Sequence, residues 1–110
     1  MKAATYVSAG VLELTEKEKP HVVKPTDAVV RMVKSTICGT DLHIWGGDVP
    51  ACKPGTTLGH EAIGIVEEVG DAVSNFKVGD KVIVSCVTAC NTCYYCKHQL
   101  PSHCEDGGWI

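Results

Sequence analysis

Four of the seven cysteines in this chain, Cys90, Cys93, Cys96 and Cys104, lie within fifteen consecutive residues. This cluster constrains the fold strongly, because a chain of 110 residues buries only a modest hydrophobic core. Cysteines with two residues between them bring their sulfur atoms together on a turn, and the fourth cysteine returns after Pro101. The spacing therefore predicts a tetrahedral zinc site with four thiolate ligands.

Zinc with four thiolate ligands has no open position, so we expect a structural site in a lobe of about residues 86–106. An iron–sulfur cluster is an alternative, but its fourth cysteine typically follows after three residues and precedes proline, whereas here the gap is seven residues and Glu105 follows. Disulfides are a second alternative and need an oxidising compartment. Four free thiols are a third, which the clustering disfavours. His98 and His103 lie inside the lobe and are expected at its surface.

The composition argues against several classes of protein. The net charge is −3 and there is no basic run, so no nucleic-acid partner is expected. Apolar runs are a few residues long, whereas a membrane-spanning helix needs roughly 20, so no membrane partner is expected. The first residues, MKAATYVSAG, lack the apolar stretch of a secretion signal. We therefore expect a cytoplasmic protein, in a reducing compartment where clustered cysteines usually bind metal.

Five short segments rich in valine and other apolar residues predict strands. They cover residues 2–9, 11–16, 28–36, 62–70 and 81–86, with turn residues between them. The sequence GTDLHIW after Cys38 predicts one helical turn with Thr40 near its N-cap. The pattern predicts one mainly β domain over residues 1–110, a small barrel or sandwich, without the βαβ unit that binds dinucleotides. Ile110 is predicted to begin a further strand.

A second group of potential metal ligands comprises Cys38 in the motif CGTDLH and His60 and Glu61 in the motif GHE. A thiolate, an imidazole and a carboxylate are ligand types of catalytic zinc, which keeps one position for water or substrate. Such a zinc acts as a Lewis acid on an alcohol or carbonyl oxygen. The residues alone leave open that Cys38 is a small buried side chain and His60 an ordinary polar group. In a regular strand His60 and Glu61 would face opposite sides, so both reach one metal only on irregular backbone.

Three polar residues after Cys38 suit supporting roles at such a site. Thr40 can hydrogen-bond the substrate oxygen, and His43 can carry a proton outward. Asp41 can orient the imidazole of His60. Spacing alone leaves open whether these side chains share one site.

Four motifs together resemble the zinc-dependent medium-chain alcohol dehydrogenases. They are CGTDLHIW at residues 38–45, GHEAIGIVEEVGDAV at 59–73, VGDKV at 78–82 and the cluster of four cysteines. The resemblance is specific, because two independent metal motifs occur in the family's order and the motifs run through most of the chain. It implies a GroES-like β-barrel with short helical turns, which is the catalytic domain of these enzymes.

By this resemblance, Cys38 and His60 are ligands of a catalytic zinc, and Glu61 lies beside the metal and binds it in some states. Thr40 and His43 match the family's proton relay, and Asp41 matches the partner of the ligand histidine. The four clustered cysteines match the structural zinc. The implied reaction is reversible hydride transfer between an alcohol and NAD or NADP, which yields an aldehyde or ketone. The full-length enzyme is expected to be a homo-oligomer.

The sequence departs from the family in two respects. It contains no glycine-rich dinucleotide fingerprint and no counterpart of the third protein ligand of the catalytic zinc, since Cys52 and Cys86 do not match it. We therefore expect a catalytic domain truncated before the Rossmann domain and inactive by itself. Val49 and Cys86 align with pocket positions that are often bulkier, which predicts room for secondary or branched alcohols; alternatively, Cys86 fills the core. A non-catalytic zinc-binding or co-chaperonin-like module would also suit the barrel.

Overall fold

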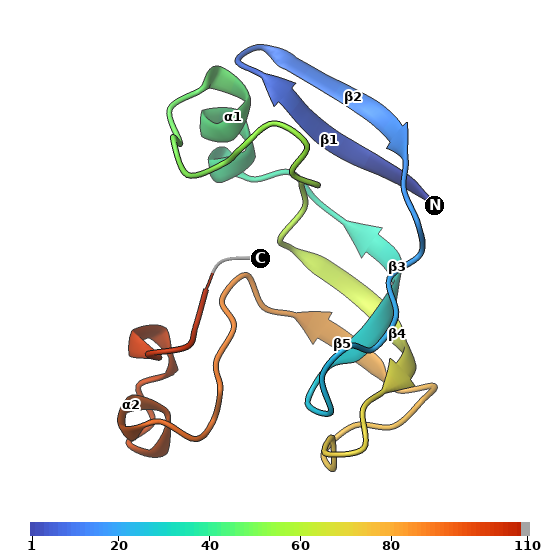
Figure 1. The fold of residues 1–110 in the computed structure, drawn as a ribbon, viewed down its shortest axis with the longest axis vertical. Helices are drawn as coiled ribbons and strands as arrows, with labels where there is room; N and C mark the ends of the chain where they lie inside the picture. The colour runs from blue at the N-terminus through green and yellow to red at the C-terminus, as the bar shows by residue number, and fades with distance from the viewer. Residues whose placement is uncertain (109–110) are drawn as a thin grey trace.

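The computed structural model describes residues 1–108, and short strands make up most of its regular structure (Figure 1). The strands are β1 (Lys2–Ser8), β2 (Val11–Glu16), β3 (Ala28–Ser35), β4 (Ala62–Val69) and β5 (Lys81–Val84). The helices are α1 (Gly39–Gly46), α2 (Tyr94–Lys97) and the 3-10 turn Pro101–His103. All five predicted strands are confirmed, and each begins at the predicted residue. The strand predicted to begin at Ile110 lies outside the described residues.

The strands form two antiparallel sheets, one of β1 and β2 and one in the order β3–β4–β5. Alternating residues of these strands face inward, and the buried apolar side chains of the described residues are Ala3, Tyr6, Val29 and Val66. This core is small, as expected for a chain of this length. The mainly β class predicted from the sequence is confirmed. None of the helices among residues 1–108 combines the length and apolar character needed to cross a membrane.

The register of β3 against β4 positions the segments that carry potential metal ligands. The last pair of this ladder is Ser35 with Ala62. The chain leaves β3 at Ser35 and reaches Cys38 three residues later, while His60 lies two residues before Ala62. The segment before His60 is fixed along the free edge of β1, where the Leu58 amide donates to the Ala4 carbonyl at 2.8 Å. Two distant parts of the sequence therefore meet beyond one end of the three-stranded sheet.

Helix α1 begins at a cap made by a cysteine. The Cys38 sulfur accepts the amide of Thr40 at 3.3 Å, and Asp41 Oδ2 accepts the amide of Cys38 at 2.9 Å. The two bonds form a reciprocal capping box with Cys38 as the cap, and the helix therefore begins at Gly39. Thr40 lies near the cap, as predicted from the sequence, but the cap residue itself is Cys38, whose sulfur accepts a free amide of the first turn. Gly47 ends the helix in the left-handed conformation, at φ +89°.

Residues 86–108 form a lobe around α2 and the 3-10 turn. Figure 1 shows it beyond β5, at the opposite end of the molecule from the β1–β2 hairpin. Its base is closed by the Thr88 amide, which donates to the Gly108 carbonyl at 3.0 Å, and by the Gly108 amide, which donates to Thr88 Oγ1 at 2.9 Å. No side chain of this lobe is buried among the described residues. The lobe therefore depends on its cysteines for cohesion.

Candidate metal centres

The four cysteines of the lobe converge on one point. All are half-buried, and their sulfur atoms lie within 4.8 Å of one another. Cys90 Sγ and Cys96 Sγ are 4.0 Å apart. Two thiolates on a tetrahedral zinc with Zn–S bonds near 2.3 Å are about 3.8 Å apart. The lobe therefore presents the donor type, number and spacing that a closed zinc site needs.

Hydrogen bonds within the lobe prepare some of these sulfurs for metal binding. Cys90 Sγ accepts the Thr92 hydroxyl at 3.3 Å and the amides of Thr92 and Cys93 at 3.4 and 3.3 Å. These bonds lower the pKa of the Cys90 thiol to about 6, and the Thr92 hydroxyl has the largest effect. Burial raises the pKa of the Cys96 thiol to about 12. At neutral pH the cluster thus holds a Cys90 thiolate beside a Cys96 thiol, and a metal must displace the proton of the thiol when it binds.

The two histidines of the lobe lie outside the cluster of sulfur atoms, as expected. His98 and His103 are exposed. His98 stacks on Tyr94 with ring centroids 4.1 Å apart, and His103 stacks on Tyr95 at 5.9 Å. Both rings therefore have aromatic partners away from the sulfur atoms.

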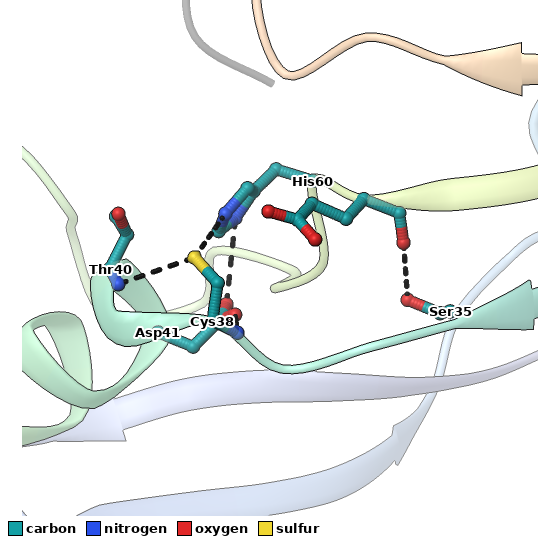
Figure 2. A network of polar contacts seen from close by, with 6 residues as sticks. Ser35, Cys38, Thr40, Asp41 and His60 are labelled. Carbon is teal, nitrogen blue, oxygen red and sulfur yellow. Dashed lines mark hydrogen bonds and ion pairs between the residues drawn. The ribbon is translucent and has the colours of Figure 1, made fainter.

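A second group of donors lies where the chain leaves β3 and enters β4. Cys38, Asp41 and His60 contribute one ligand atom each within 4.8 Å. Cys38 Sγ is 2.9 Å from His60 Nε2, and Asp41 Oδ1 is 3.5 Å from His60 Nδ1 (Figure 2). A ring proton on Nδ1 therefore faces the carboxylate and leaves the Nε2 lone pair on the side of the sulfur. This is the arrangement that a metal-binding histidine needs.

The charges of this group reinforce one another. Hydrogen bonds from the Thr40 side chain and amide, followed by His60, lower the pKa of the Cys38 thiol. The hydrogen bond to Cys38 raises the pKa of His60, with further support from the Asp41 charge and against the effect of burial. Without metal, a Cys38 thiolate beside a protonated His60 imidazolium is thereby favoured, and the ring gives up its Nε2 proton when a metal binds. The thiolate and imidazole suit a divalent zinc ion, and two protein ligands leave further coordination positions open.

Glu61 lies outside this group of donors, and Asp41 is its third member. The Glu61 side chain is exposed, and the Glu61 carbonyl accepts the Ser35 hydroxyl at 2.8 Å. The backbone is irregular here, as the sequence required: Gly59 has φ +119°, and residues 59–61 belong to no strand. Ser35 was not singled out from the sequence, because a serine at the end of a strand carries no signal of its own.

Thr40 and His43 flank the second site on helix α1. Thr40 is half-buried, and its amide donates to Cys38 Sγ. His43 is exposed, with Nδ1 at 3.3 Å from Asp48 Oδ2. Thr40 is therefore next to the sulfur, and His43 is at the surface one helical turn further on.

Comparison with known proteins decides the family of this chain. The description "Alcohol dehydrogenase GroES-like domain" matches residues 24–109. The chain belongs to this family. An alcohol dehydrogenase of Cupriavidus necator is 40% identical over 110 residues, which are 100% of this chain and 29% of the relative. The resemblance seen in the sequence motifs is thereby confirmed.

Solved structures share the fold of this GroES-like domain. The apo form of zinc-dependent alcohol dehydrogenase 2 from Streptococcus pneumoniae matches 100% of this chain and 32% of its own, with a TM-score of 0.94 and 65% identity. A zinc-binding dehydrogenase from Sinorhizobium meliloti, bound to NADP, matches 99% of this chain and 31% of its own, with a TM-score of 0.80 and 32% identity. The chain thus spans about a third of these proteins.

An apolar groove of about 450 Å³ borders the second site of the GroES-like domain. Asp41 lines it together with Leu42 and Trp45 from the same helix. Val49 and Cys86 are not among its lining residues. Val49 is half-buried and Cys86 is exposed, so the alternative that Cys86 fills the core is wrong. Their part in a substrate pocket stays a prediction.

Proposed function

We propose that this domain provides the catalytic zinc centre of an alcohol dehydrogenase that interconverts alcohols with aldehydes or ketones, using NAD or NADP. One observation carries the proposal. Cys38 and His60 face each other as an incomplete ligand set beside a threonine, in a chain that holds a complete four-thiol site elsewhere. A purely structural module needs only the closed site. The NADP bound to the Sinorhizobium protein supports a nicotinamide cosubstrate.

In this proposal Cys38 and His60 bind the catalytic zinc through Sγ and Nε2. When bound there, zinc supplies a Lewis acid that makes an alcohol oxygen more acidic. Asp41 keeps the ring proton on His60 Nδ1, so that Nε2 stays available. Glu61 is proposed as an exchangeable ligand, because its carboxylate follows the ligand histidine directly. The four lobe cysteines hold a second, structural zinc.

Thr40 and His43 move the proton of the substrate in this proposal. Thr40 follows Cys38 by two residues, and its hydroxyl accepts a hydrogen bond from the alcohol. His43 is exposed and receives the proton near bulk water. The proton therefore travels along α1 from the site to solvent, in the direction in which exposure increases.

The 110 residues are proposed to be inactive alone and to act with a dinucleotide-binding domain. The reason is that the described residues contain no βαβ unit. A cytoplasmic location is proposed because all seven cysteines are free thiols in the described structure. A homo-oligomeric enzyme is proposed from the family resemblance. The molar mass of the enzyme that carries this domain, measured by light scattering, tests this proposal.

Metal binding by the 110-residue chain tests the proposed function. We expect about two Co²⁺ per chain, one held tightly by the lobe and one weakly at Cys38 and His60. Cys38→Ser is expected to abolish the weaker site only. Ethanol and butan-2-ol should change the visible spectrum of the weaker Co²⁺ in the unmodified chain. A stoichiometry near one, unchanged by Cys38→Ser, would instead favour a non-catalytic zinc module.

Substrate size is the finer part of the proposal. Val49 and Cys86 are small residues at proposed pocket positions, so secondary alcohols should be accepted in the enzyme that carries this domain. Relative kcat/KM for ethanol, propan-2-ol and butan-2-ol measures this. A strong preference for ethanol would contradict it. Val49→Trp should shift the preference toward ethanol by narrowing the pocket.

A further inference from the structure

We infer that Ser35 is a positioning residue that fastens together the two chain segments carrying Cys38 and His60. The inference rests on the proposed function and deepens it, because it names a residue that sets the geometry of the same metal site. The observation behind it is one hydrogen bond, in which the Ser35 hydroxyl donates to the Glu61 carbonyl at 2.8 Å. Figure 2 shows this bond beside the Cys38–His60 contact.

The bond lies where backbone pairing ends. Ser35 and Ala62 form the last pair of the β3–β4 ladder, and residues 59–61 belong to no strand. The ladder therefore leaves the His60 segment without a strand partner. The Ser35 side chain extends the connection by one residue, to the carbonyl of Glu61. The carbonyl that it holds belongs to the residue directly after His60.

Both ends of this bond are close to a metal ligand in the sequence. Ser35 precedes Cys38 by three residues, and Glu61 follows His60 by one. The hydrogen bond therefore holds together the backbone segments that carry two ligands 22 residues apart in the sequence. On the other side of His60, Gly59 has φ +119°, a conformation that side-chain-bearing residues rarely adopt. The position of the His60 backbone is thus set by a turn before it and by the hydrogen bond from Ser35 after it.

This geometry has a consequence for metal binding rather than for the fold as a whole. The Ser35 side chain is exposed, so its loss leaves no buried cavity. Loss of the hydrogen bond next to His60 in the chain lets Nε2 move relative to Cys38 Sγ. Part of the free energy of metal binding is then used to restore the alignment, so the affinity falls. One hydrogen bond of ordinary strength corresponds to about a two- to tenfold change in a binding constant.

The experiment titrates Co²⁺ into the 110-residue chain after one equivalent of zinc has filled the lobe. Ser35→Ala is expected to weaken Co²⁺ binding at Cys38 and His60 by about two- to tenfold and to alter the visible spectrum of the bound ion. Ser35→Thr keeps the hydroxyl and should restore both. Ser8→Ala is the matched control, because it removes an exposed serine hydroxyl from the end of β1 in the other sheet.

The outcomes separate this inference from the proposed function. Unchanged affinity and spectrum in Ser35→Ala, with Co²⁺ bound normally by the zinc-filled unmodified chain, would overturn the role of Ser35 and leave the catalytic zinc site intact. Equal weakening in Ser35→Ala and Ser35→Thr would also overturn it, since the hydroxyl would then be irrelevant. Absence of Co²⁺ binding by the zinc-filled unmodified chain would overturn both. Thermal unfolding of each variant reports any general loss of folding.

Discussion

Replacing Asp41 with asparagine tests how far the proposed catalytic site depends on the carboxylate that faces His60. Asp41 Oδ2 accepts the Cys38 amide at 2.9 Å, and Oδ1 lies 3.5 Å from His60 Nδ1. Both oxygens of the carboxylate therefore face an N–H group. Asparagine has nearly the same shape but only one oxygen, so its NH₂ group must face one of the two donors. The substitution removes an acceptor and a charge without creating a cavity.

The structure sets the size of the effect on metal affinity. A hydrogen bond to a charged group contributes about 1.5–3 kcal/mol, which corresponds to about 10- to 150-fold in a binding constant. Screening by water is limited, because the side chains of Asp41 and His60 are each only 12% exposed. The 3.5 Å separation is longer than the roughly 2.8 Å of an optimal charge-assisted bond, which favours the lower part of the range. We expect Asp41→Asn to weaken Co²⁺ binding about ten- to thirtyfold.

Titration of Co²⁺ into the chain with a zinc-filled lobe measures this loss. Asp48→Asn is the matched control, because it removes an exposed carboxylate that contacts His43 rather than His60. Its Co²⁺ affinity should equal that of the unmodified chain. If Asp41→Asn bound Co²⁺ within a factor of about two of the control, the reasoning would be refuted, since His60 would then not depend on its carboxylate partner.

Three further predictions address the sulfur and imidazole groups and the turn before His60. In metal-free protein near pH 7.5, iodoacetamide should modify Cys90 faster than Cys96, because the pKa values of their thiols lie at about 6 and about 12. Peptide mass spectrometry measures both rates, and Thr92→Val should slow the reaction of Cys90. Equal rates for the two cysteines would contradict the pKa assignment. Co²⁺ affinity at the second site should fall as the pH is lowered, with a midpoint above 6.5. The reason is that the pKa of His60 is raised and the ring must lose a proton to bind metal. A midpoint below 6.5 would argue against this explanation. Gly59→Ala should lower the free energy of unfolding in urea by about 1–3 kcal/mol. The cause is the φ of +119° alone, since the added carbon meets no atom within 4 Å apart from its neighbours in the chain. An unchanged urea midpoint would show that alanine fits this turn without strain.

Local features of this protein were predictable from sequence because they depend on neighbours in the chain. The strands begin at the predicted residues, since apolar alternation and turn residues act over a few positions. The four lobe cysteines were grouped correctly, because gaps of two residues bring sulfurs together on any tight turn. Cys38 was not predicted as the cap of α1, because cysteine is an unusual cap residue whereas threonine is a common one.

The sequence by itself determined which donors this domain contains and which of them are neighbours in the lobe. Only the tertiary structure decided that Cys38 and His60 meet, because they are 22 residues apart and their approach depends on the pairing of β3 with β4. The same pairing brings Asp41 Oδ1 to His60 Nδ1, in the orienting role predicted for Asp41, and the Ser35 hydroxyl to the Glu61 carbonyl. The physical reason is that the register of a sheet is set by all of its cross-strand contacts together, and no single short motif encodes it.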